Sequence, residues 1–266
     1  MTLMRLLLLT TLTVACNAPA PTPTPAPKSA PTPEPAPPRH DALPPGFHAQ
    51  EHELAEEMAQ PAVDHRPRGH HKHHRFDRAD DWVAQFDAAD RVDWQKPDAV
   101  IAALALAPDA TVVDLGAGTG YFTVRLARAV SKGRVYAEDL EPDMVRYLGE
   151  RAARESLGNI TAVRGTADDP KLPGPVDVAV MVDTYHHIAD PTAFFARVRD
   201  SLRPGGLLVI VDFKKDAPDD APGPPAPMRI ADEIVTAHLR KLGYVHERTD
   251  RALLPYQYLV FMRRPK

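Results

Sequence analysis

The stretch VVDLGAGTGYF, residues 112–122, places three glycines at alternate positions directly after an apolar run. Gly116, Gly118 and Gly120 suit a strand-to-helix turn, because glycine takes a positive φ without strain and lets a ligand approach closer than a Cβ allows. Dinucleotide-binding turns follow G-x-G-x-x-G, whereas the spacing here is G-x-G-x-G, with Tyr121 filling the space a pyrophosphate needs. The pattern predicts a ligand-binding turn and disfavours a nicotinamide-dependent oxidoreductase.

Strand-like and helix-like segments alternate around this turn. Five apolar runs predict strands: TVVDL, RVYAED, NITAVRG, VDVAVMVD and GLLVIVDF. Helical spacing lies between them, in two segments within residues 76–106, the second opened by Pro97, and in one helix from about Met228 to Leu242. The closing runs YVHERTDR and YQYLVFMRR are separated only by ALLP, which predicts an antiparallel hairpin at the sheet edge. The fold class expected is therefore α/β, with a Rossmann-like, seven-stranded, mostly parallel sheet and helices on both faces.

A ribose-binding turn of this kind needs an acidic residue at the end of the second strand, about 20 residues beyond the glycines. The sequence offers Glu138 and Asp139. Side chains alternate along a strand, so we expect only one of the two to face the ligand. Asp139 is the first choice and Glu138 the alternative.

Four motifs, VVDLGAGTGYF, VYAEDLEPDM, VDVAVMVDTYHHI and LRPGGLLVIVDF, resemble in order and spacing those of class I S-adenosylmethionine-dependent methyltransferases. They are most similar to the small-molecule branch that includes quinone-biosynthesis and arsenite methyltransferases. The resemblance covers about residues 93–266 and implies the sheet order 3-2-1-4-5-7-6, with the last strand antiparallel. It also implies methyl transfer from the cofactor S-adenosylmethionine to a small molecule that the sequence does not identify.

The resemblance implies roles for individual residues. Asp114 would orient the glycine turn and meet the methionine amine, Asp139 would bind the ribose hydroxyls, and Ala167 with Asp168 would border the adenine. The full cofactor-binding set expected is Asp114, Gly116, Ala117, Gly118, Gly120, Asp139, Leu140, Ala167, Asp168 and Asp183. Two features depart from the family: Thr166 stands where many relatives have Asp, and the absence of cysteine beyond Cys16 excludes the thiol chemistry of arsenite methyltransferases.

The residues that follow the fourth strand are the natural ones to face the methyl group. Tyr185, His186 and His187 are the catalytic candidates, since histidine can take a proton from a hydroxyl or an acidic carbon near neutral pH. Two other interpretations stay open: the pair positions the substrate, or it only supports the next helix, which Asp190 and Pro191 open. Trp94 precedes the first strand and either walls the pocket or packs in the core.

The first 15 residues have the layout of a secretory signal, with a lone Arg5, a short apolar run and a small residue before Cys16. LTVAC resembles the lipobox of bacterial lipoproteins, which implies a lipid on Cys16 and a membrane-anchored protein on the periplasmic or outer-membrane side. Residues 16–50 are a proline-rich linker that would be extended. An ordinary signal peptide stays open, as does a true start near Met58, which would make the protein cytoplasmic.

Residues 51–79 contain five histidines between His65 and His74, interleaved with Lys72 and arginines. Imidazole binds borderline transition metals, but the neighbouring cations and the lack of a close carboxylate argue against a defined site. We expect a solvated, partly helical or disordered basic segment, with adventitious metal binding or a lid as alternatives, and we predict no metal site. The methyltransferase domain is expected over residues 80–266.

Composition limits the partners. The formal net charge of −4 over 266 residues gives no general attraction to nucleic acid. The apparent export keeps a second function open, because S-adenosylmethionine is made in the cytoplasm. In that alternative, the chain is a catalytically inactive membrane-anchored lipoprotein that binds a nucleoside-like or metal ligand. The oligomeric state is not predicted.

Overall fold

The computed structural model describes residues 76–266. The signal-like segment, the proline-rich linker, Cys16 and the histidine cluster lie outside the described residues, so the expectations about them stay predictions. Within the described part of the chain, no helix is both long and apolar enough to cross a membrane.

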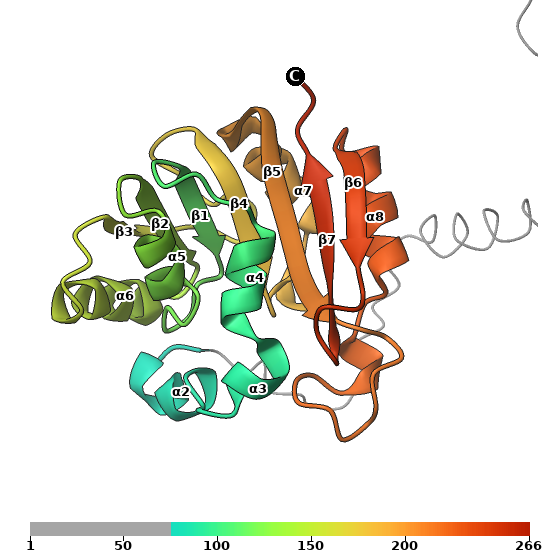
Figure 1. The fold of residues 1–266 in the computed structure, drawn as a ribbon, viewed down its shortest axis with the longest axis horizontal. Coiled ribbons are helices and arrows are strands. Elements are labelled where there is room, and N and C mark those ends of the chain that lie inside the picture. Colours follow the sequence, from blue (N-terminus) through green and yellow to red (C-terminus); the bar gives the residue numbers. More distant parts are fainter. Residues whose placement is uncertain (1–75) are drawn as a thin grey trace, which may run out of the picture. The chain divides into compact units, whose positions relative to one another are not determined.

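Seven strands form one sheet in the order β3-β2-β1-β4-β5-β7-β6 (Figure 1). The strands are β1 (Thr111–Leu115), β2 (Arg134–Asp139), β3 (Ile160–Arg164), β4 (Val176–Val182), β5 (Leu202–Phe213), β6 (Val245–Asp250) and β7 (Gln257–Arg263). Strands β1 to β5 pair in parallel, β7 runs antiparallel to β5, and β6 pairs antiparallel with β7. The predicted sheet order and the terminal hairpin are both confirmed.

Helices cover both faces of the sheet, as predicted. They are α2 (Ala79–Phe86), α3 (Arg91–Gln95), α4 (Pro97–Ala103), α5 (Thr123–Ala129), α6 (Pro142–Arg154), α7 (Pro191–Ser201) and α8 (Asp232–Lys241). Helices α4 and α5 pack on the face that carries Val112 and Val180, together with α6 on β2 and β3. Helices α7 and α8 pack on the opposite face, which carries Val113 and Met181. The central strands are thus apolar on both sides because neither side meets water.

The segment before β1 forms three helices, whereas the sequence predicted two. The extra break lies at Lys96, which has a φ of +45° and separates α3 from α4. A residue that precedes proline is disfavoured in the α conformation, so Lys96 cannot continue α3 into Pro97. Pro97 then opens α4, as expected.

Helix α8 begins at Asp232, four residues later than the predicted start at Met228. Met228 instead belongs to a short 3-10 turn, η2 (Ala226–Met228). The buried Arg229 donates hydrogen bonds to the carbonyl oxygens of Pro224 and Ala217, so it fixes the proline-rich loop and delays the helix. The predicted opening of α7 is confirmed, because the Asp190 carboxylate accepts a hydrogen bond of 3.0 Å from the Ala193 amide.

Candidate functional site

The glycine turn joins β1 to α5 at the carboxyl edge of the sheet. Gly116, Gly118 and Gly120 have φ values of +67°, +57° and +90°, as their spacing predicted. The Ala117 amide donates a hydrogen bond of 2.8 Å to the Glu138 carbonyl oxygen, which ties the turn to the end of β2. The turn therefore has a fixed shape that presents its backbone to the space beyond the strands.

Replacing Gly116 with alanine is expected to lower the free energy of unfolding by about 1–3 kcal/mol, because alanine would be strained at this positive φ. Its Cβ would also lie 2.4 Å from Thr184 Cγ2. Gly149→Ala is the matched control: Gly149 is a helical residue of α6 with nothing within 4 Å of the added Cβ. That change should stabilise the protein by roughly 0.5–1 kcal/mol. Urea unfolding of both variants measures the difference, and an equal effect would contradict this account of the turn.

Two carboxylates at the end of β2 bind the turn. Asp139 accepts hydrogen bonds of 2.9 Å from the amides of Gly118 and Glu141, and Glu138 accepts one of 3.3 Å from the Gly116 amide. The alternation of side chains along a strand predicted that only one of them would face the turn. Both carboxylates contact it, because the turn passes around the end of β2. Asp139 is the more accessible of the two, at 9% exposure against 3% for Glu138.

The turn is surrounded by buried acidic groups. Burial raises the pKa of Asp139, and burial together with the charge of Asp139 raises the pKa of Glu138 well above its usual value. Burial likewise raises the pKa of Asp114 to about 6, although Asp114 accepts a hydrogen bond of 2.6 Å from the Thr123 hydroxyl. Buried carboxylates that repel one another favour a cationic ligand, since a positive charge nearby stabilises their ionised forms.

These residues fit S-adenosylmethionine, which carries an ammonium and a sulfonium group. Each carboxylate oxygen of Asp139 accepts a backbone hydrogen bond and keeps a lone pair for a ribose hydroxyl. Leu140 is 50% exposed beside it and offers an apolar surface to a base. Within the described residues, the buried hydroxyls of Thr119 and Tyr121 have no hydrogen-bond partner, which leaves polar atoms at the turn for a ligand. Ala167 and Asp168 are exposed at the end of β3, where Asp168 accepts a hydrogen bond of 2.7 Å from Thr166.

Helices α2 and α3 cover the turn. Ring carbons of Phe86 lie 3.3 and 3.4 Å from the position of a Cβ on Gly118. The Phe86 ring also contacts Trp82 at 5.5 Å and Phe76 at 5.6 Å between centroids. Trp94 is half-buried, with its ring 6.0 Å from that of Phe213. The cover is thus built mainly from α2, which the sequence did not assign to the site.

Asp183 was predicted to bind the cofactor, but in the structure its carboxylate is hydrogen-bonded to other side chains of the protein. Its carboxylate accepts hydrogen bonds from Gln95 at 2.8 Å, from Arg91 at 3.2 Å and from Gln257. Burial raises the pKa of Asp183, while the charge of Arg91 opposes the shift. This carboxylate therefore fastens α3 to the ends of β4 and β7. Sequence reasoning missed its three partners, because they lie 74 to 92 residues away along the chain.

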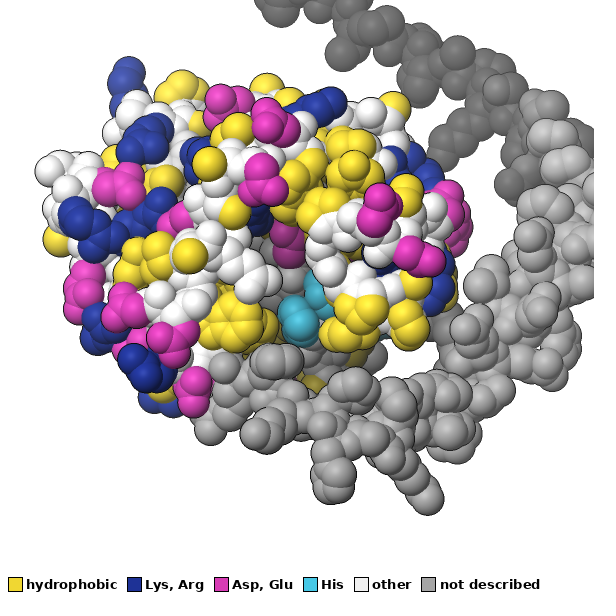
Figure 2. Space-filling view, turned by 90° about the horizontal axis from the view of Figure 1, so that it is seen from below, with side chains coloured by type: hydrophobic (Ala, Val, Ile, Leu, Met, Phe, Trp, Pro, Cys, Tyr) yellow, Lys and Arg dark blue, Asp and Glu magenta, His cyan; other side chains and the backbone are white. Residues whose placement is uncertain are grey.

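His186 and Asp212 form a buried pair beside the turn. His186 lies in the 3-10 turn η1 (Tyr185–His187), directly after β4, and its Nδ1 is 2.9 and 3.1 Å from the two carboxylate oxygens of Asp212 at the end of β5. The Thr184 hydroxyl, one residue before η1, donates a hydrogen bond of 2.9 Å to the Val182 carbonyl oxygen and lies 3.4 Å from the Gly116 carbonyl oxygen, so this side chain adjoins the glycine turn. Seen from the end of the molecule that α2 and α3 occupy, a histidine side chain is visible in a hollow beside hydrophobic side chains (Figure 2); of the two adjacent histidines, His187 is exposed, whereas the His186 side chain is only 3% exposed. Asp212 was not among the predicted residues.

The other two catalytic candidates differ from His186. Tyr185 is buried, stacks on Phe195 and shares a hydrogen bond of 2.8 Å with His238 Nδ1, so its hydroxyl points into the core beneath α7 and α8. That placement removes Tyr185 from the candidates. The ring of His187 lies 4.1 Å from that of His186, and burial together with the charge of His186 lowers the pKa of His187 to about 4. His187 is therefore neutral at physiological pH.

No group of three or more histidine, cysteine or acidic side chains in residues 76–266 is placed to hold a metal ion.

Comparison with known proteins agrees with this geometry. Residues 112–206 match the family model described as a methyltransferase domain. Malonyl-[acyl-carrier protein] O-methyltransferase of Hahella chejuensis is 33% identical over 98 residues, which cover 37% of this chain and 34% of that protein. Ubiquinone/menaquinone biosynthesis C-methyltransferase of a Marinomonas species is 28% identical over 107 residues, which cover 39% of this chain and 43% of that protein. The chain thus spans less than half the length of these curated relatives.

Solved structures extend the likeness over the described part of the chain. A SAM-dependent methyltransferase from Aquifex aeolicus has a TM-score of 0.64 and 26% identity, covering 69% of this chain and 97% of that one. The glycopeptide N-methyltransferase MtfA, solved with sinefungin, shares the fold with a TM-score of 0.54 and 17% identity. Residues 112–206 thus match a methyltransferase domain, and residues 76–266 have the fold of S-adenosylmethionine-dependent methyltransferases.

Proposed function

We propose that this protein transfers a methyl group from S-adenosylmethionine to a small molecule whose reacting atom must lose a proton, with His186 as the base. The observation that supports the proposal most is the buried His186–Asp212 pair, which lies next to the glycine turn through Thr184. When bound, S-adenosylmethionine supplies an activated methyl group, so the protein has only to hold the acceptor in line, exclude water and remove a proton.

Asp212 sets the tautomer of His186. An ionised carboxylate can only accept hydrogen bonds, so the neutral imidazole carries its proton on Nδ1 and leaves Nε2 free to take one from an acceptor. Asp212 is itself held by the amides of Phe213, at 2.7 Å, and His186, at 3.3 Å. This is the base-and-orienting-group arrangement that serves many hydrolases, here without a protein nucleophile.

The side chain of His186 is only 3% exposed. The acceptor would therefore reach Nε2 after a rearrangement of the neighbouring side chains, of which His187 is the nearest aromatic one. A buried base is protected from water. This suits methyl transfer, because exclusion of water from the site prevents side reactions.

The pKa of His186 should be raised in the folded protein and should fall in Asp212→Asn. Burial alone lowers this pKa, but the hydrogen bond and charge of Asp212, with the charge of Asp183, outweigh burial and raise it above 6.5. His186 then contributes stability that is fully present below pH 6.5 and is lost as the pH rises through its folded pKa. The ring of His187 lies 4.1 Å from that of His186 and stays neutral down to about pH 4.

NMR titration of the histidine ring resonances checks this result without knowledge of the acceptor. His187→Gln should leave the midpoint of His186 raised, because His187 carries no charge near neutral pH. An unchanged midpoint in Asp212→Asn would contradict the role given to Asp212.

The proposal as a whole is tested by the release of S-adenosylhomocysteine. The full-length protein is incubated with S-adenosylmethionine and a panel of phenols, enols, carboxylic acids and amines. Release that depends on one acceptor class and is lost in His186→Ala would support methyl transfer with a histidine base. Turnover that is equal in both proteins would rule out His186 as the base.

A further inference from the structure

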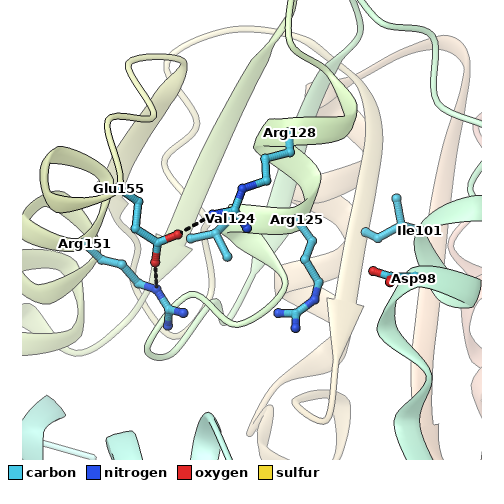
Figure 3. Close-up of a pocket in the computed structure, with 7 residues that line it drawn as sticks. All are labelled: Asp98, Ile101, Val124, Arg125, Arg128, Arg151 and Glu155. Atoms are coloured by element: carbon cyan, nitrogen blue, oxygen red, sulfur yellow. Dashed lines mark hydrogen bonds and ion pairs between the residues drawn. The ribbon is translucent and has the colours of Figure 1, made fainter. Parts of the chain in front are cut away.

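A pocket lies between α4, α5 and the C-terminal end of α6, next to the glycine turn. It is open, has a volume of about 460 Å³ and is lined by Asp98, Ile101, Val124, Arg125, Arg128, Arg151 and Glu155 (Figure 3). Asp98 and Ile101 come from α4, and Arg125 and Val124 face them from α5. The pocket therefore carries charged side chains from all three helices, together with the partly buried Ile101.

The charges in this pocket are only partly paired. Glu155 binds Arg128 at 2.7 Å through one oxygen and Arg151 at 2.9 Å through the other. Arg125 has no carboxylate within 4.0 Å, and Asp98 has no cation within that distance, among residues 76–266. A guanidinium and a carboxylate thus line one pocket without touching, and each keeps its charge for a ligand.

The guanidinium of Arg125 is held in position by the glycine turn. It lies 4.0 Å from the centre of the Tyr121 ring and donates a hydrogen bond of 2.6 Å to the Tyr121 carbonyl oxygen. Arg91 covers the same ring at 4.2 Å and also binds Asp183. Arg151 donates a hydrogen bond of 2.9 Å to the Thr119 carbonyl oxygen. Arg125 and Arg151 therefore both donate hydrogen bonds to backbone carbonyl oxygens of the glycine turn, which is the proposed cofactor site.

We infer that this pocket binds a zwitterion of the α-amino acid type. Its carboxylate would pair with Arg125 and with the outer N–H groups of Arg128, since guanidinium groups match carboxylates in a bidentate geometry. Its ammonium group would pair with Asp98, and an apolar side chain would lie on the partly buried Ile101. A simple anion uses only half of this arrangement and would be repelled by Asp98.

Isothermal titration of L-leucine into the full-length protein tests the site. Saturable binding with a Kd that is roughly millimolar or tighter is expected. Leucinamide lacks the carboxylate and N-acetyl-L-leucine lacks the ammonium group, so both should bind at least about tenfold more weakly. No saturable heat for L-leucine, or equal binding of all three compounds, would overturn the proposal.

Variants separate a zwitterion site from an anion site. Asp98→Asn and Arg128→Gln should each weaken L-leucine binding at least about tenfold, because each removes one charge-assisted contact. Both side chains are exposed in part and neither binds the turn, so the fold should persist. Arg240→Gln, an exposed arginine on α8, is the matched control and should change nothing. Tighter binding of inorganic phosphate than of L-leucine in Asp98→Asn, with L-leucine unaffected, would show an anion site and overturn the proposal.

Occupancy of the pocket should tighten cofactor binding, because a carboxylate on Arg125 offsets the repulsion between Arg125 and Arg91 across the Tyr121 ring. This step rests on cofactor binding at the turn. L-leucine should lower the Kd of S-adenosylhomocysteine by about fivefold, and the effect should vanish in Asp98→Asn. Binding of L-leucine without any change in that Kd would overturn the coupling while leaving the site intact. Failure of S-adenosylhomocysteine to bind would instead contradict the proposed methyl transfer, since the L-leucine titration reads the pocket independently.

Discussion

His186→Ala should lower kcat by about 10²- to 10⁴-fold, the usual contribution of a positioned general base. Asp212 is fully buried and holds the ring by Nδ1, so the change removes the imidazole that Asp212 orients to take a proton from the acceptor. The Kd of S-adenosylhomocysteine should stay the same, because the contacts proposed for the cofactor come from the turn and from Asp139. The initial rate of S-adenosylhomocysteine formation with the acceptor found in the panel measures kcat.

His187→Ala is the control for this prediction. It removes an adjacent imidazole that is neutral at physiological pH and that forms no ion pair with a carboxylate of residues 76–266. Its effect on kcat should be much smaller than that of His186→Ala. If His186→Ala weakened cofactor binding as strongly as it slowed turnover, the histidine pair would be a support for the site and the base assignment would be wrong.

Asp139→Ala should weaken the binding of S-adenosylmethionine at least about 100-fold, because two ribose hydroxyls would lose charge-assisted hydrogen bonds. The same change also frees the amides of Gly118 and Glu141, which Asp139 holds at 2.9 Å, so the turn would loosen. Asp139→Asn keeps a hydrogen-bond acceptor but loses the charge. Its affinity for S-adenosylmethionine should therefore lie between those of the native protein and Asp139→Ala. Asp219→Ala, in an exposed loop after β5, controls for the loss of a carboxylate and should bind normally.

Much of the fold could be predicted from the sequence because the spacing of apolar residues, and the residues that begin helices and form turns, agreed with the observed burial. The apolar runs of β1 and β4 are buried on both faces, and Asp190 and Pro191 open α7 where their chemistry placed the start. The alternate glycines required positive φ and have it. Each of these features depends on neighbours in the chain, which is the information that local patterns carry.

The parts that could not be predicted depend on contacts between distant residues. Asp212 is 26 residues from His186, and nothing near it in the sequence distinguishes the buried end of β5 as a base-orienting carboxylate. Asp183 was expected to bind the cofactor because it directly follows β4, but Gln257, near the C-terminal end of the chain, donates a hydrogen bond to its carboxylate. Tyr185 adjoins the same strand, yet the 3-10 turn rotates its side chain toward His238.

The central claim is that the glycine turn and Asp139 together bind S-adenosylmethionine. The measurement that tests it most directly is isothermal titration of S-adenosylmethionine and S-adenosylhomocysteine into the full-length protein and into Asp139→Ala, with circular dichroism to show that both are folded. We predict roughly micromolar binding of both compounds to the native protein and at least about a 100-fold loss in the variant. Absence of binding to the folded native protein, or equal affinity in the two proteins, would contradict the account.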